Sequence, residues 1–210
     1  MKNSKKIQSL VKKSNKEMTE GNWIEAIKIL RELIKIFPNS TPLLTNISLS
    51  LANTKSFDEA HQHIDQANKN EPLNVTTKYV KAYCFELEKK FDDAIDGYKK
   101  CLKINKEHKD SWIRIAIISR KQSKYDDALN IYNHIFSKII NDPNILTDIG
   151  ITLYEKGDLN KAEEILKHRL SIDENSIITK QFLSKIYHQD INKKQLAVEL
   201  DKEIDGLIKL

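Results

Sequence analysis

Hydrophobic and polar positions recur along this chain with a fixed spacing. Alanine occupies one column of the pattern five times, at intervals of 34 residues: Ala26, Ala60, Ala94, Ala128 and Ala162. Large apolar residues stand three positions before each alanine: Trp23, Phe57, Phe91, Tyr125 and Leu159. Small residues stand twelve positions before it: Ser14, Ser48, Ala82, Ala116 and Gly150. A period of this size indicates a repeat array, in which each unit is one supersecondary element stacked on the next.

Each period predicts two helices joined by a tight turn. In the second half of the first period, Ile27, Leu30 and Ile34 follow the spacing of one helix face. Turn-forming residues such as Gly21-Asn22 and Gly157-Asp158 lie between the small site and the alanine. Small residues at two sites of the period allow the two helices to approach closely. The sequence therefore predicts an antiparallel helix pair in each unit.

Helix-capping residues support this division. The sequence from Ser56 to Glu59 has the form of a capping box, which begins a helix. Ser40 and Asp142 are each placed to cap a helix whose first turn contains a proline, Pro42 or Pro143. With only five glycines and four prolines, the composition favours helices over strands. The predicted fold class is all-α.

The pattern resembles the tetratricopeptide repeat (TPR), whose 34-residue unit has a small residue in its first helix, an aromatic residue opening the second and an alanine after it. Residues 22–39 and 112–128 match this unit well, as do Gly150, Gly157 and Ala162. The resemblance covers roughly residues 7–176. It implies a right-handed superhelical solenoid of antiparallel helix pairs.

The predicted organisation is a basic lead-in over residues 1–6, followed by five units. The unit ranges are 7–40, 41–74, 75–108, 109–142 and 143–176. Five residues depart from the family pattern and place local packing in question. Lys78 and Lys81 replace apolar residues in the third unit, Lys106 and Ile140 replace the terminal proline of two units, and Arg169 replaces a small or apolar residue in the fifth.

Residues 177–210 predict a degenerate sixth unit that caps the array. Ser184 stands at the position of the small residue, but the alanine, Ala197, comes one residue later than the repeat register requires. The last helix is predicted to bury one apolar face: Leu196, Leu200, Ile204 and Leu207. Terminal repeats need one buried face and one solvated face.

Charge and cysteine content place few further constraints. The net charge of +5 is modest for 210 residues. Cys84 and Cys101 fall at helix sites that face neighbouring helices, so we expect buried free thiols and a reducing, cytoplasmic location. We expect no membrane span and no signal peptide, since apolar runs are short.

No catalytic or metal-binding arrangement stands out. His61 and His63 are two residues apart and so lie on different faces of a helix. Gly150 and Gly157 occupy repeat sites and lack the lysine of a phosphate-binding loop. At Gly97, in mid-helix, close packing is a simpler explanation than a kink. The sequence predicts no enzyme and no cofactor.

The N-terminal lysines precede any acidic residue: Lys2, Lys5, Lys6, Lys12, Lys13 and Lys16. We interpret them as a solvated, partly frayed helix face, because arginine, the better phosphate ligand, is absent. Contact with nucleic acid or with an anionic membrane is the alternative. Helical repeats that read RNA have a 35-residue period, so the 34-residue register argues against nucleic acid.

In the TPR family, the first helices of successive units line a concave groove that holds peptide segments. The resemblance transfers this role to twelve residues: Asn15, Asn46, Tyr79, Val80, Tyr83, Ile113, Arg114, Ile117, Arg120, Lys121, Ile151 and Tyr154. Tyr79 and Tyr83 could instead turn into the core and compensate for the nearby lysines. Ile113 and Ile117 are predicted to face the groove and to form its apolar centre.

One specialised groove of the family, which grips the tails of heat-shock chaperones, is not predicted. Asn15 and Asn46 match its asparagines. Its cationic sites are occupied by Val11, Thr76 and Val80, so a terminal carboxylate would lack charged partners.

These observations predict a non-catalytic protein-interaction module or adaptor. Its ligand would be a peptide segment or helix of another protein, with acidic residues beside an apolar anchor as one form. A self-associating assembly scaffold is the alternative, and an RNA-binding helical repeat is a weaker one.

Overall fold

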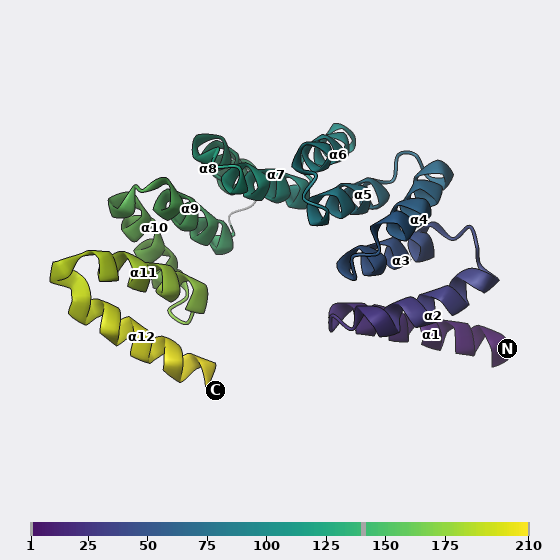
Figure 1. Ribbon diagram of the computed structural model, residues 1–210, viewed down its shortest axis with the longest axis horizontal. Helices are drawn as coiled ribbons and strands as arrows, with labels where there is room; N and C mark the ends of the chain where they lie inside the picture. Colours follow the sequence, from purple (N-terminus) through teal and green to yellow (C-terminus); the bar gives the residue numbers. More distant parts are fainter. Residues whose placement is uncertain (1, 140–141, 210) are drawn as a thin grey trace. The chain divides into compact units, whose positions relative to one another are not determined.

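The computed structural model describes residues 2–139 and 142–209, and the regular elements in these ranges are all helical (Figure 1). Of the residues that depart from the family pattern, Ile140 lies outside the residues that the structure describes. The α-helices are α1 (Lys2–Thr19), α2 (Trp23–Ile36), α3 (Thr41–Asn53), α4 (Phe57–Asn70), α5 (Val75–Leu87), α6 (Phe91–Ile104), α7 (Lys109–Lys121), α8 (Tyr125–His134), α9 (Pro143–Lys156), α10 (Leu159–Ile172), α11 (Ile177–Gln189) and α12 (Lys194–Ile208). A π-helical turn, η1 (Ile135–Ile139), follows α8, and a 3-10 turn, η2 (Ile191–Lys193), precedes α12. The predicted all-α fold class is confirmed.

The helices divide into two compact units, residues 1–111 (unit 1) and residues 112–210 (unit 2), with the boundary inside α7. In unit 1 the closest packing is within the pairs α1–α2, α3–α4 and α5–α6. In unit 2 it is within the pairs α9–α10 and α11–α12. In these five pairs each helix therefore packs mainly on its neighbour in sequence, as the repeat pattern predicts. The first helix begins at Lys2, so residues 2–6 belong to α1 and form no separate lead-in.

The alanine column marks the contact between the two helices of each pair. All five alanines of the register are completely buried, as predicted. Four residues of the small column are also completely buried: Ser14, Ser48, Ala82 and Ala116. At the fifth site, a Cβ atom on Gly150 would lie 2.5 Å from Leu166 Cδ2. These sites are small because the facing helix leaves no room for more atoms.

The predicted turns between paired helices share one backbone conformation. Five residues spaced 34 apart have positive φ: Gly21 (76°), Lys55 (64°), Lys89 (63°), Ser123 (60°) and Gly157 (92°). The left-handed conformation disfavours side chains with a Cβ, so glycine is the easiest residue to place there. The turn recurs at three positions without glycine, which shows that the paired helices impose it.

The capping predictions are confirmed in part. Asp142 Oδ1 accepts a hydrogen bond from the backbone N–H of Asn144 at 2.9 Å, as an N-cap does. Ser56 and Ser40 stand at the N-caps of α4 and α3, but neither side chain accepts a capping bond. The predicted capping box at residues 56–59 is therefore wrong. The repeating turn positions these helix starts, so the side-chain bond is not needed to place them.

The last helix pair is present, with one correction to its predicted face. Ser184, Ala197 and Ile204 are buried, whereas Leu196 is 46% exposed. Leu200 and Leu207 are half-buried, so three of the four predicted residues lie on the buried face of α12, and Ala197 stands there in place of Leu196. Leu196 was therefore wrongly assigned to the buried side.

Ion pairs on Glu163 join α10 to the turn before α12. The Glu163 carboxylate is 2.5 Å from Lys193 Nζ and 2.7 Å from Lys167 Nζ. Both ammonium groups also lie near the ring of Tyr187, at 5.6 and 5.8 Å from its centroid. Burial opposes ionisation of Glu163, but the hydrogen bonds from both lysines outweigh it and lower its pKa.

We expect Glu163→Gln to destabilise unit 2 by about 1.5–3 kcal/mol at neutral pH, because two charge-assisted hydrogen bonds are lost. Since the pKa of Glu163 is lowered by folding, its contribution is complete above the unfolded value of about 4.3. It disappears as the pH falls through the lower pKa of the folded state. Urea unfolding of both proteins across the acid range should therefore show their difference shrinking with pH. Glu164→Gln, at the exposed neighbouring position, is the control.

Both cysteines are buried free thiols, as predicted. Burial raises the pKa of Cys84 to about 11 and also raises the pKa of Cys101. A hydrogen-bond contact with Ser48 Oγ, at 3.6 Å from Cys84 Sγ, opposes this rise in the pKa of Cys84 but does not cancel it.

Because the thiolate is the reactive form, native Cys84 and Cys101 should react very slowly with an aromatic disulfide reagent at mildly alkaline pH. Two thiols should be released to the reagent on unfolding in urea. Rapid modification of the folded protein at either cysteine would contradict the buried placement.

Candidate protein-binding surface

The predicted groove residues fall in two sets, which we name by unit. The unit 1 surface comprises Asn15, Asn46, Tyr79 and Tyr83, on α1, α3 and α5. The unit 2 surface comprises Ile113, Arg114, Ile117, Arg120, Lys121 and Tyr154, on α7 and α9. The remaining two predicted residues, Val80 and Ile151, are 4% and 7% exposed. Each packs inside its own unit, so their assignment to an open groove is corrected.

The two asparagines of the unit 1 surface are direct neighbours. Asn46 Nδ2 donates to Asn15 Oδ1 at 3.3 Å, which joins α1 to α3. Asn15 is exposed and Asn46 is half-buried. An asparagine has four hydrogen-bonding positions, so further groups on both side chains are open to a ligand or to water.

The two tyrosines of the unit 1 surface differ. Tyr79 packs against the core, with its ring centroid 5.4 Å from that of Tyr98 and 5.5 Å from that of His108. The sequence left open whether Tyr79 faces the groove or the core, and the structure places its ring against the core. Tyr83 is half-buried and does not belong to this core cluster.

The lysines that depart from the family pattern replace apolar packing by polar contacts. Lys81 Nζ lies 2.6 Å from Asp65 Oδ1, and Lys78 Nζ donates to Asn68 Oδ1 at 3.5 Å. A cavity of about 330 Å³ lies between α4, α5 and α6 beside these groups, and Gly97 is part of its wall. The departure thus opens a polar cavity and leaves the helix pair intact.

An isoleucine pair forms the apolar part of the unit 2 surface. Ile113 and Ile117 lie four residues apart on α7 and are both half-buried. Both pack against the core cluster that contains Ala116, Ala128 and Tyr132. The core residues beneath Ile113 and Ile117 therefore hold these two side chains in place, while part of each remains accessible to a ligand.

Arg120 belongs to a polar cluster that the sequence did not predict. This Arg120 cluster comprises Arg120, Tyr132, Asp148 and Glu155. Its Nη1 lies 3.3 Å from Glu155 Oε1, and its side chain is only 16% exposed. Burial raises the pKa of Asp148, and the positive charge of Arg120 opposes that rise. Burial, and then the charge of Asp148, raise the pKa of Tyr132. Arg120 and Glu155 are 35 residues apart, close to the repeat period, and this spacing could have indicated from the sequence that they lie on adjacent units.

The Arg120 cluster leaves two buried polar atoms without a hydrogen-bond partner among the described residues, namely Arg120 Nε and the Tyr132 hydroxyl. Tyr154, on α9, contacts α11. Its ring packs edge-on to Phe182 at 5.5 Å between centroids, and its hydroxyl accepts from Gln189 Nε2 at 3.1 Å. These contacts join α9 to α11.

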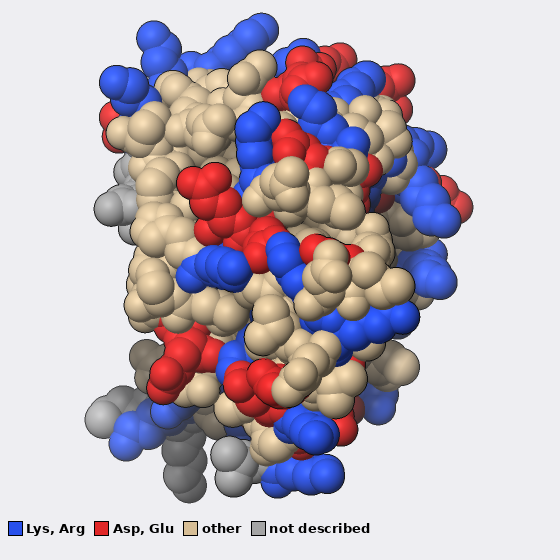
Figure 2. Space-filling model, turned by 90° about the vertical axis from the view of Figure 1, so that its left-hand side faces the viewer, with Lys and Arg blue, Asp and Glu red and all other residues tan. Residues whose placement is uncertain are grey.

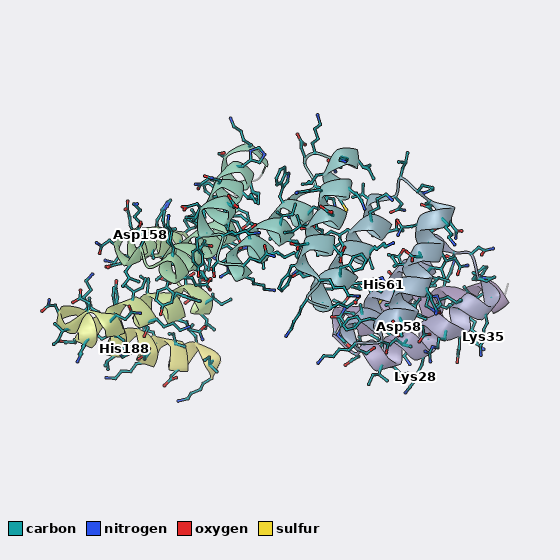
Figure 3. The ribbon with its side chains drawn as sticks, turned by 45° about the horizontal axis from the view of Figure 1, so that its top comes forward. Lys28, Lys35, Asp58, His61, Asp158 and His188 are labelled. Carbon is teal, nitrogen blue, oxygen red and sulfur yellow. The ribbon has the colours of Figure 1, made fainter. Side chains whose placement is uncertain are left out.

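Histidines contact carboxylates in both units, and Figure 3 labels the two histidines concerned, His61 and His188. His61 on α4 pairs with Glu88, and the His61 ring packs on Phe85 at 4.8 Å between centroids. On α11 and α12, Asp201 accepts from Ser184 Oγ at 2.6 Å and contacts His188 Nε2 at 2.9 Å. The carboxylate lies between the hydroxyl and the imidazole, so His188 is not placed to take a proton from Ser184.

No group of three His, Cys, Asp or Glu side chains that could hold a metal ion occurs in residues 2–139 and 142–209. Among the helices of these same ranges, none is long and apolar enough to span a bilayer.

Comparison with known proteins points to the same repeat. A family model described as tetratricopeptide repeat matches residues 13–40. Residues 13–40 are thus identified as a tetratricopeptide repeat. The chain is also 18% identical, over 151 residues, to the tetratricopeptide repeat-containing protein trd-1 of Caenorhabditis elegans. The aligned part covers 72% of this chain and 19% of the relative, so this chain spans about a fifth of that relative's length.

Solved structures show the same fold. A tetratricopeptide repeat protein from Parabacteroides merdae superposes with a TM-score of 0.74 at 17% identity, covering 95% of this chain and 79% of its own chain. YrrB, described as a TPR protein with an unusual peptide-binding site, gives a TM-score of 0.59 at 16% identity and covers 85% and 91% of the two chains. The TPR fold is thus shown over most of the chain.

Proposed function

We propose that this protein is a non-catalytic adaptor whose unit 2 surface binds a peptide segment or helix of another protein. The observation that carries the proposal is the isoleucine pair, Ile113 and Ile117, partly accessible on α7 and backed by the core. The TPR fold is typical of protein-interaction modules, and the peptide-binding site named for YrrB supports the same class of ligand.

The apolar pair would supply most of the binding free energy. A few desolvated side chains usually contribute most of the binding free energy of an interface. Side chains that already pack against the core lose little conformational entropy on binding. Two isoleucines one helical turn apart match the spacing of apolar residues on a ligand helix or in an extended segment. An apolar ligand side chain seated between Ile113 and Ile117 is the expected anchor.

The cationic side chains of the unit 2 surface would contribute less to ligand binding than the sequence suggested. Glu155 already pairs with Arg120, so an acidic ligand residue would compete for that guanidinium. Acidic residues beside the anchor should therefore change the association rate more than the affinity. The buried free thiols support a reducing, cytoplasmic setting for this binding.

A peptide library displayed on phage, selected against the full chain, tests the proposal. Selected peptides should share an apolar anchor, and Ile117→Asp should weaken their binding at least tenfold, about 1.4 kcal/mol. Ile24→Asp is the matched control, because Ile24 is 68% exposed on α2 and lies outside both surfaces. Circular dichroism establishes that each variant is folded.

Equal binding by wild type and a folded Ile117→Asp variant would refute the unit 2 surface as the site. Light scattering addresses the alternative role, assembly by self-association. A mass of two or more chains that Ile117→Asp reduces to one would favour the scaffold over the adaptor.

A further inference from the structure

The net charge of this protein is concentrated in one helix. Residues 2–19, which form α1, contain six lysines and one acidic residue, Glu17. The rest of the chain has 29 basic and 29 acidic residues, which balance. The whole excess of +5 therefore resides in α1. Elsewhere charges of both signs intermingle, as Figure 2 shows on the side of the molecule that carries α11 and α12.

The lysines of α1 share one face. At 100° per residue, Lys5, Lys6, Lys12, Lys13 and Lys16 fall within an arc of about 120°. We call these five residues the lysine face, and all five are exposed. The apolar side chains of α1, among them Ile7 and Leu10, lie on the opposite side and pack against the unit 1 core.

Neighbouring carboxylates neutralise little of the lysine face. Lys13 Nζ lies 3.8 Å from Glu25, and Lys16 Nζ lies 3.6 Å from Glu20. All four side chains are more than 40% exposed, and such surface pairs contribute about 0–1 kcal/mol. Residues 2–19 form a continuous helix of about 27 Å, so the charges are held in a line.

We propose that the lysine face docks on an anionic lipid bilayer by charge alone, with α1 remaining packed on α2. Clusters of four to eight basic residues on an amphipathic helix bind anionic headgroups, with about 1 kcal/mol for each lysine near the surface. A straight helix face meets a planar surface along its whole length. The apolar side of α1 is already used in the core, so no insertion into the acyl region is involved.

The composition of α1 favours a bilayer over nucleic acid. Sequence-tolerant binding of single strands uses aromatic side chains on which bases stack, and α1 has none. Bidentate phosphate recognition uses arginine, which α1 also lacks. Lysine ammonium groups suit the diffuse charge of a headgroup layer.

Co-sedimentation of the full chain with vesicles tests the proposal. The protein should bind phosphatidylcholine vesicles that contain phosphatidylserine and should not bind phosphatidylcholine alone. Replacing Lys5, Lys6 and Lys12 by glutamine should lower the partition coefficient roughly a hundredfold, about fivefold for each lysine. The matched control replaces Lys99, Lys103 and Lys202, which are exposed on α6 and α12, and lowers the net charge equally. The control should bind like wild type.

Salt gives a second readout. Raising the ionic strength from about 0.1 M to 1 M shortens the screening length from about 10 to 3 Å, so binding should vanish. Binding that survives high salt would overturn the charge-only mode, since it would indicate insertion. Equal loss in both triple variants would refute the lysine face as the site. Salt-sensitive binding to a labelled RNA oligonucleotide without vesicle binding would assign the face to nucleic acid instead.

This proposal is independent of the peptide-binding surface. Ile117→Asp should leave vesicle binding unchanged, and the lysine-face variant should retain peptide binding.

Discussion

Deletion of residues 177–210 is expected to make the protein aggregate or melt at a clearly lower temperature. The deletion removes α11 and α12, whose Leu183, Ile186 and Tyr187 are at most 5% exposed and complete the core of unit 2. Burial of each such side chain stabilises the fold by about 1.5–3 kcal/mol. The sum approaches the total stability of an ordinary domain, about 5–15 kcal/mol.

The surface uncovered by this deletion contains apolar side chains. Half-buried Leu170 lines a pocket with Leu183 and Tyr187 of α11, and completely buried Leu166 belongs to the same core cluster. Ile165 lies instead beside α8 and α9. Repeat arrays need a terminal unit to cover such a face. The ion pair between Glu163 and Lys193 would be lost as well.

Thermal melting by circular dichroism and size measurement by light scattering check this prediction. As a control, replacing the exposed Leu196 and Val198 by glutamine should leave the melting temperature nearly unchanged. A truncated chain that stays monomeric and melts like the full chain would show that residues 177–210 are an appendage.

Gly97→Ala is expected to destabilise unit 1 by about 1–3 kcal/mol, although alanine is the better helix former. A Cβ atom on Gly97 would lie 2.6 Å from Ala82 Cβ and 3.1 Å from Ala82 Cα. Because the second atom belongs to the backbone of α5, the helices α5 and α6 would have to separate. Of the two explanations offered for this mid-helix glycine, close packing is confirmed.

Gly206→Ala is the matched control. Gly206 is also within a helix, α12, but a Cβ atom there would meet nothing within 4 Å. The same substitution should therefore stabilise the protein by about 0.5–1 kcal/mol through helix propensity alone. Urea unfolding of both variants measures the contrast. If the two changes had the same sign, the close approach of α5 and α6 would be disproved.

The sequence alone determined the features that every unit must repeat. Two helices cannot pack closely without small residues at their contact, so the column from Ala26 to Ala162 identified the buried contact of each unit. A tight turn between antiparallel helices needs one residue with positive φ, and its place recurs with the same period. Buried thiols followed from the same register, because Cys84 and Cys101 lie on helix faces directed at neighbours.

Only the tertiary structure decided how individual side chains are used. A repeat register assigns a residue to a helix face, but its exposure depends on how closely the next helix approaches. Val80 and Ile151 are buried for this reason, and Tyr79 turns towards Tyr98. The pairing of Arg120 with Glu155 depends on rotamers that a neighbouring helix selects, and sequence spacing does not specify them.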